Sequence, residues 1–120
     1  MATELSEQEF GRYECPIPEY PNVWVKFRNS GYPCGLRKRL DDARIDDVQI
    51  LDIILPFVEG WGLVDITGKP VPLPPPDKRT SEVVVNVEEG VTAWLIGTFY
   101  RHRIALLQPR PNSSAPSSET

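Results

Sequence analysis

The sequence predicts a small single-domain α+β protein, in which a short antiparallel β element packs against two or three helices. Residues 22–28 (NVWVKFR) alternate between apolar and polar side chains, as a strand with one buried face does. Residues 46–59 repeat apolar side chains at helical spacing. Residues 65–68 (DITG) have the composition of a tight turn between two short extended segments. Together these features predict helices against one face of a small sheet.

The predicted sheet pairs the strand at 22–28 with a hairpin at 62–73. The first arm of this hairpin is the apolar stretch 63–66. The aspartate of the turn can accept hydrogen bonds from the backbone that follows it, and Gly68 supplies a positive φ. The second arm, 69–73, contains two prolines. Because proline cannot donate a backbone hydrogen bond, this arm can only be an edge strand.

A short helix is predicted at residues 35–43. Two leucines and an alanine recur there every three or four positions, opposite the basic cluster 37–39 (RKR). Such a cluster can bind phosphate or RNA. However, Asp41 and Asp42 follow it at once, so the interpretation we favour is a solvated helix face.

The last ordered element is predicted to be a helix that starts near residue 86. Asn86 and Glu89 have the spacing of a capping box, and apolar side chains follow at helical spacing. The preceding run 83–85 (VVV) has two interpretations. It is either a strand or a short helical turn capped by Thr80 or Ser81.

The helix predicted at 46–59 has more apolar surface than a surface helix needs. Asp46 or Asp47 can cap its start, and Pro56 predicts a kink or an early end. Its apolar side chains form two stripes instead of one. Either both stripes pack in the core, or the second stripe binds a partner protein. The residues of that second stripe are Ile50, Ile54, Phe57 and Trp61.

The two ends of the chain differ in composition from its middle. The chain has 120 residues, which leaves room for one core. Residues 1–21 are polar and interrupted by prolines, so we expect an extended or flexible N-terminal arm. Residues 22–107 form the predicted globular domain. Residues 108–120 are rich in proline and serine, which predicts a disordered C-terminal tail.

Charge and cysteine usage indicate a cytoplasmic protein. The net charge of −4 gives no electrostatic footprint for nucleic acid. No signal peptide is evident, and the longest apolar stretch, 50–58, is too short to span a bilayer. Cys15 and Cys34 lack the spacing of a metal site. We expect two free thiols in a reducing cytosol, and neither a nucleic acid nor a membrane as partner.

The sequence contains no motif of a catalytic, cofactor-binding or metal-binding site. His102, the single histidine, is interpreted as a partly exposed residue near a helix end, where the helix dipole favours it. The pairs at 41–42 and 46–47 lack the alternating ligands and the central glycine of a metal loop. We interpret them as signals for a helix end and a helix start. We therefore expect no enzyme activity, no cofactor and no metal.

Several stretches resemble small proteins of tailed bacteriophages and prophages. The first is 27–33 (FRNSGYP), followed by 36–37 (LR). The second is 53–58 (IILPFV), followed by 60–73 (GWGLVDITGKPVPL). In this second stretch a tryptophan precedes an acidic turn to glycine and a Pro-x-Pro, a pattern that resembles tail assembly chaperones. The end of the chain, 112–117 (NSSAPS), is similar to the ends of such proteins.

The resemblance covers residues 22–116 and implies a role without catalysis. Tail assembly chaperones coat the tape-measure protein, keep it soluble and help to recruit tail-tube subunits in the cytoplasm of the bacterial host. The tape-measure protein and the tail-tube subunits are therefore the implied partners. A tape-measure protein is a long helix with exposed apolar stripes, so the second stripe of the 46–59 helix would be the surface that binds it.

Two other functions stay open at this stage. The first is a structural component of the virion, such as a tail-completion or connector protein. The second is a small nucleic-acid-binding regulator that uses the 37–39 cluster, although the acidic balance of the chain argues against it. The sequence also leaves open whether the chain forms homo-oligomers.

Overall fold

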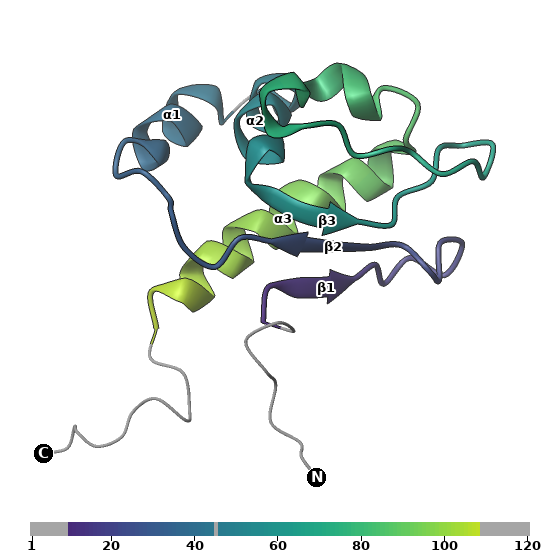
Figure 1. Ribbon diagram of the computed structural model, residues 1–120, viewed down its shortest axis with the longest axis horizontal. Helices are drawn as coiled ribbons and strands as arrows, with labels where there is room; N and C mark the ends of the chain where they lie inside the picture. The colour runs from purple at the N-terminus through teal and green to yellow at the C-terminus, as the bar shows by residue number, and fades with distance from the viewer. Residues whose placement is uncertain (1–9, 45, 109–120) are drawn as a thin grey trace, which may run out of the picture.

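The computed structural model describes residues 10–44 and 46–108 and confirms the α+β class. This part of the chain contains one three-stranded antiparallel sheet and three α-helices (Figure 1). The elements are β1 (Arg12–Glu14), β2 (Trp24–Phe27), α1 (Leu36–Ala43), α2 (Asp47–Ile54), β3 (Val58–Trp61) and α3 (Glu89–Leu106). Three 3₁₀ turns accompany them: η1 (Leu55–Phe57), η2 (Pro76–Lys78) and η3 (Ser81–Val84).

The sheet has the order β1-β2-β3, and its central strand is the one predicted at 22–28. The predicted partner was wrong, because β2 pairs with β3 at 58–61 and not with the 62–73 hairpin. In that hairpin only Val64 and Pro70 form an isolated bridge. The prolines account for this, since they remove the donors that a longer ladder needs.

β1 extends the sheet into the segment that the sequence analysis assigned to an N-terminal arm. Arg12 pairs with Lys26, and Glu14 pairs with Trp24. The domain boundary expected at residue 22 is therefore too late. Within the described part of this segment, Arg12–Glu14 is the extended stretch that pairs with β2, and turns follow it before β2 begins. Residues 1–9 of the expected arm and 109–120 of the expected tail lie outside the described residues.

α2 is shorter than the helix predicted at 46–59, and Pro56 explains why. The α-helix ends at Ile54 and tightens into η1, in which Pro56 occupies the first turn. Proline has no N–H for an α-helical hydrogen bond and is tolerated only where that donor is not required. After η1 the chain is extended and becomes β3. The early end that Pro56 predicts is confirmed, and the residues it releases supply the third strand.

The helix starts follow the predictions at α1 and α2 but not at α3. The side chain of Asp46 accepts hydrogen bonds from the backbone N–H groups of Val48 and Gln49, as an N-cap does. The capping box predicted for α3 is absent, because Glu88 is the N-cap and makes no side-chain cap bond. The run 83–85 contributes to η3, which Thr80 caps through Glu82 N–H, so the helical-turn interpretation is the correct one.

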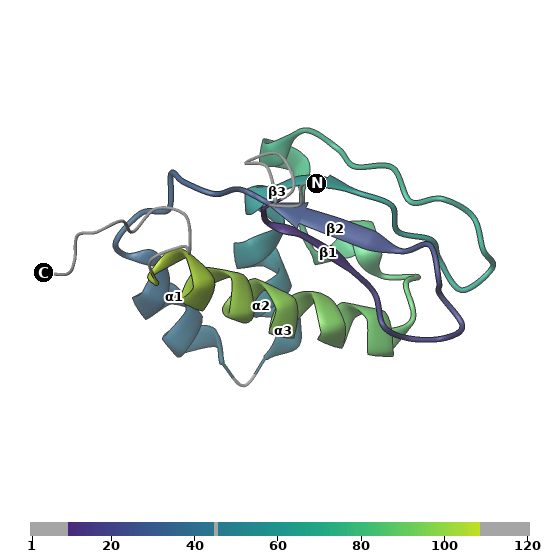
Figure 2. The ribbon, with the colours of Figure 1, turned by 90° about the horizontal axis from the view of Figure 1, so that it is seen from below.

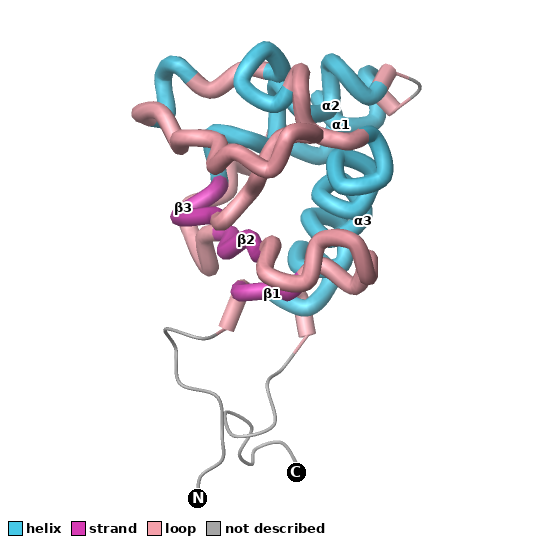
Figure 3. The backbone as a smooth tube through the Cα atoms, turned by 90° about the vertical axis from the view of Figure 1, so that its right-hand side faces the viewer, coloured by secondary structure: helices cyan, strands magenta, loops and turns pink. Residues whose placement is uncertain are grey.

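The helices cover one face of the sheet, so the molecule has two layers (Figure 3). Val25 and Phe27 point into the space between the layers and are buried, as the alternation predicts. Phe27 meets Phe99 of α3 edge to face, with 5.3 Å between ring centroids. On the outer face Trp24 lies against Gly60 and Gly62.

The predicted turn at 65–68 is confirmed. One carboxylate oxygen of Asp65 accepts hydrogen bonds from the Thr67 N–H at 2.8 Å, the Thr67 hydroxyl at 2.6 Å and the Lys69 N–H at 3.1 Å. Gly68 has φ +88°, the left-handed conformation that glycine adopts without strain. These hydrogen bonds lower the pKa of Asp65, with the bond from the Thr67 hydroxyl contributing most.

The structure also describes the state of the two cysteines and the character of the helices. Cys15 is buried and Cys34 is exposed, and both are free thiols, as predicted. None of the described helices combines the length and the apolar character that crossing a bilayer requires.

Candidate functional site

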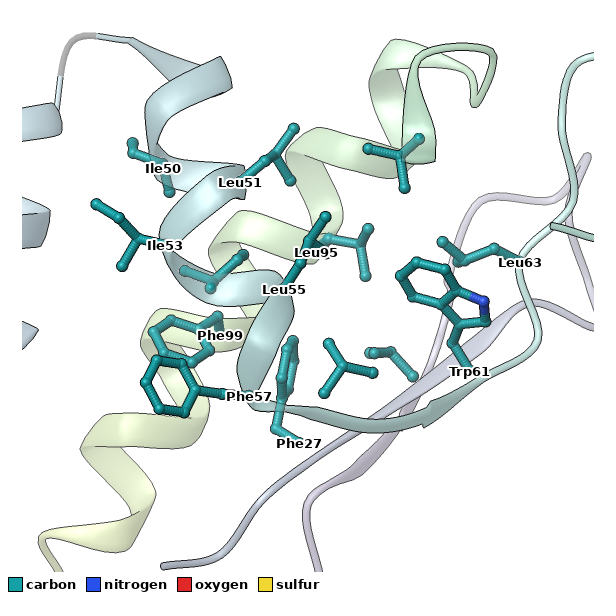
Figure 4. Packing of buried hydrophobic residues seen from close by; sticks show 14 of the residues in the cluster. Phe27, Ile50, Leu51, Ile53, Leu55, Phe57, Trp61, Leu63, Leu95 and Phe99 are labelled. Atoms are coloured by element: carbon teal, nitrogen blue, oxygen red, sulfur yellow. The ribbon is translucent and has the colours of Figure 1, made fainter. Parts of the chain in front are cut away.

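The predicted partner-binding stripe lies in the core. Ile50, Ile54, Phe57 and Trp61 are each 9% exposed or less, and Figure 4 shows three of them among other buried side chains. The expectation that this stripe is an exposed surface was wrong. In the other stripe Leu51, Leu55 and Val58 are also buried, whereas Val48 is 55% exposed. The alternative, in which both stripes pack in the core, therefore holds except at Val48.

The position of α2 explains why all its large apolar side chains except Val48 are covered. The helix packs against α1, α3 and η3, and η3 is tied to it by a hydrogen bond from the Ser81 N–H to Asp52. After Pro56 the chain changes direction. Phe57 then stacks beside Phe99 of α3, and the Trp61 indole N–H donates to the Val71 carbonyl at 2.8 Å. With neighbours on three sides, α2 leaves Val48 as its one exposed large apolar side chain, and a single such residue does not make an apolar face for a partner.

His102 is fully buried, so the interpretation as a partly exposed helix-end residue was wrong. Its Nε2 lies 2.9 Å from the Arg28 carbonyl oxygen, which can only accept, so Nε2 carries a proton. Its Nδ1 lies 2.8 Å from the Tyr13 hydroxyl, which donates to it in the neutral ring. The ring also stacks on Phe27 and lies edge to face with Tyr13. His102 therefore links the end of α3 to β1 and to the residue after β2.

Arg79 is a buried cation that the sequence analysis did not single out. Its guanidinium donates to the backbone carbonyls of Pro74 at 2.6 Å and Val58 at 2.6 Å, with a longer bond to Leu55 at 3.4 Å. Burial lowers the pKa of this side chain. Leu55 begins η1 and Val58 begins β3, so Arg79 fastens the proline-rich connector to the chain at both ends of the η1 turn. No motif in the sequence signals this role.

An open groove lies between α1 and α3. It has a volume of about 300 Å³ and is lined by Arg37, Leu40, Asp41, Tyr100, Arg103, Ile104 and Leu107. Figure 2 shows the C-terminal end of α3 beside α1, where this groove lies. We call it the α1–α3 groove.

Two exposed apolar side chains form the outer part of the α1–α3 groove. Ile104 is 57% exposed and Leu107 is 81% exposed, whereas Leu40 at the base is buried. Tyr100, which also lines the groove, is half-buried. Tyr100, Ile104 and Leu107 follow i, i+4, i+7 spacing, so one side of the helix carries all three. Large apolar side chains that gather on a surface mark interaction sites, whereas single ones are ordinary.

The spacing of Tyr100, Ile104 and Leu107 is present in the sequence, but periodicity alone does not show that this side of the helix lies outside the core. Ile104 and Leu107 lie two and five residues beyond His102, which is about half a turn and one and a half turns further along.

Charges of both signs border the α1–α3 groove. Burial raises the pKa of Tyr100, with a further increase from the Asp41 carboxylate and an opposing decrease from the Arg103 guanidinium. Both charged groups are thus close enough to act on the tyrosine. Arg37 and Arg103 form no ion pair with another described residue. The rim therefore has two arginines and one aspartate.

The remaining predicted candidates lie where the sequence analysis expected them. The side chains of the 37–39 cluster are exposed on α1, and Lys38 pairs with Asp42 at 3.4 Å. Asp46 caps α2 and Asp47 lies in its first turn. Within residues 10–44 and 46–108, no three His, Cys, Asp or Glu side chains gather as a metal site would require.

Comparisons of the chain with protein-family models, curated proteins and solved structures gave no match.

Proposed function

We propose that the chain is a tail assembly chaperone of a tailed bacteriophage, which holds a helical partner protein through an exposed apolar surface. The proposed partners are the tape-measure protein and the tail-tube subunits, and the proposed site of action is the cytoplasm of the bacterial host. The pattern of a tryptophan, an acidic turn to glycine and a Pro-x-Pro in residues 60–73 supports this family.

One observation carries the proposal. Ile104 and Leu107 lie exposed beside Tyr100 in the α1–α3 groove. Grooves of this kind bind amphipathic helices, which place apolar side chains at i, i+3, i+4 and i+7 into them. A tape-measure protein would offer such side chains repeatedly along its length. The proposal therefore keeps the type of partner that the sequence predicts and moves the contact from α2 to the end of α3.

Co-expression tests the function. The full chain is produced together with the tape-measure protein of the same phage genome, and the soluble fraction of the tape-measure protein is measured. We expect this fraction to rise when the chain is present and the complex to survive affinity purification. An unchanged soluble fraction and no co-purification would contradict the proposal.

Mass spectrometry of mature phage particles separates a chaperone from a structural component. A chaperone leaves the particle before completion, so we expect the chain to be absent from purified virions. Its presence in a fixed copy number would instead make it a tail-completion or connector protein.

A further inference from the structure

The α1–α3 groove has the length of about two turns of a helix. Tyr100 and Leu107 are seven residues apart on α3, which corresponds to about 10 Å along the helix axis. Leu40 of α1 closes the groove at its base. A partner helix placed along α3 could therefore bury Ile104 and Leu107 together while it contacts Tyr100.

The openness of the groove argues against a small molecule as its occupant. Small-molecule sites enclose most of the ligand surface. Here Ile104 and Leu107 are more than half exposed, so a small ligand would stay in contact with water on one side. A partner helix would cover these side chains with its apolar face and would keep only its opposite, polar face in water.

The charges of the rim indicate which helix would fit. Arg37 comes from α1 and Arg103 from α3, so the two arginines border the apolar floor from two elements. Neither forms an ion pair with another described residue. Arginine binds carboxylates with two parallel hydrogen bonds, which favours acidic side chains on the partner. Asp41 repels an acidic residue next to it and so restricts the orientation of the partner helix.

We propose that the α1–α3 groove binds an amphipathic helix of the partner protein, whose apolar stripe is flanked by acidic residues. This inference rests on the proposed function and specifies the surface and the chemistry of that contact. The apolar stripe covers Ile104 and Leu107, and the flanking carboxylates pair with Arg37 and Arg103.

The apolar half of the proposal is tested with Ile104→Asp in the full chain, co-expressed with the tape-measure protein of the same phage genome. Val85→Asp is the matched control, because Val85 is also exposed (67%) but lies at the end of η3. We expect the Ile104 variant to recover about tenfold less soluble tape-measure protein, as loss of a central apolar contact does. The Val85 variant should match the wild type. Circular dichroism confirms that both variants are folded.

The charged half is tested with the double substitution Arg37→Glu and Arg103→Glu, against Arg37→Lys and Arg103→Lys. We expect the glutamate pair to lose most of the recovered partner and the lysine pair to keep most of it, because lysine retains the charge. Equal recovery with the two double variants would contradict the proposal that acidic residues flank the apolar stripe of the partner helix.

The outcomes separate this inference from the function on which it rests. If the wild-type chain keeps no tape-measure protein soluble, both proposals are overturned. If the wild type succeeds and the folded Ile104→Asp variant succeeds equally, the function stands and the groove is the wrong surface. If light scattering shows that the isolated chain is a dimer and that Ile104→Asp makes it a monomer, the groove is an interface between two copies, which also overturns the inference.

Discussion

α2 and the C-terminal end of α3 are both rich in apolar side chains, yet their surroundings are opposite. In α2 four of eight residues are buried, namely Ile50, Leu51, Ile53 and Ile54. At the end of α3 the large aliphatic residues Ile104 and Leu107 face solvent. The sequence suggests the reverse, because α2 has the more conspicuous surplus of apolar residues.

The difference comes from the neighbours of each helix and not from its composition. α2 has α1, α3 and η3 around it. The end of α3 extends past the sheet (Figure 1), and α1 borders it on one side only. An apolar stripe is therefore evidence for a contact, but only the fold decides whether the contact is internal. In this chain the internal contacts stabilise the domain, and the exposed stripe is available to a partner.

The largest effect that separates the two regions is expected from truncation of one isoleucine in each. Ile54→Ala should lower the free energy of unfolding by about 2–5 kcal/mol, because Ile54 is completely buried and its removal leaves a cavity. Ile104→Ala should change it by no more than about 0.5 kcal/mol, since this side chain is largely exposed. Urea unfolding of the two variants measures both values. Similar losses would mean that the end of α3 is part of the core.

A second effect is expected on the outer face of the sheet, where Trp24 depends on a glycine. An added Cβ at Gly62 would overlap the Trp24 indole ring, which has Arg12 on it at 4.0 Å. Gly62→Ala should therefore cost about 1–3 kcal/mol, as overpacking does, and should shift the tryptophan fluorescence.

Gly60→Ala, two residues earlier in β3, is the matched control, because its Cβ would meet the Trp24 ring only at 3.4 Å. We expect it to cost less than Gly62→Ala. Equal costs for the two variants would show that the position of Trp24 does not depend on the space above Gly62.

A third, smaller effect is expected where β1 meets α3. Tyr13→Phe removes the hydroxyl that bonds to His102, and loss of one such hydrogen bond costs about 1 kcal/mol. The control is Tyr20→Phe, because the Tyr20 hydroxyl forms no hydrogen bond to another described residue and this side chain is also half-buried. Urea unfolding should show a loss for the first variant only. No loss in either would mean that the bond does not help to hold β1 in the domain.

Local signals in the sequence predict much of this fold. The alternation around Val25 identifies the central strand, Asp46 identifies the start of α2, and Asp65 with Gly68 identifies the turn. Each of these depends on the conformation of a few adjacent residues. Local propensity therefore decides them.

The pairing of the strands and the α1–α3 groove depend on residues far apart in the sequence. Patterns within a single sequence report only on residues close to one another, so they do not predict these contacts. β1 pairs with β2 across a loop, and three residues of this strand carry too little alternation to be recognised. His102 is buried because Tyr13 and the Arg28 carbonyl meet it from distant segments. The exposure of Ile104 likewise depends on where the sheet ends. Periodicity identifies a face of a helix but not what covers it.

The smallest effect is expected at the exposed turn, where Asp65 makes the stability of the domain depend on pH. The direction of this dependence follows from the shift of its pKa. Its pKa is lower in the folded chain than the ordinary value of 3.8. The carboxylate form is thus favoured by folding, and its contribution to stability is present above that value and lost as the pH falls through the folded pKa. The stability difference between the wild type and Asp65→Ala should be small at neutral pH and should disappear in strong acid.

Thr67→Val removes the hydroxyl that contributes most to the shift, so an NMR titration should find the pKa of Asp65 closer to 3.8 in that variant. An unchanged pKa would mean that the backbone N–H groups alone stabilise the carboxylate, and the turn would then need no particular residue at position 67.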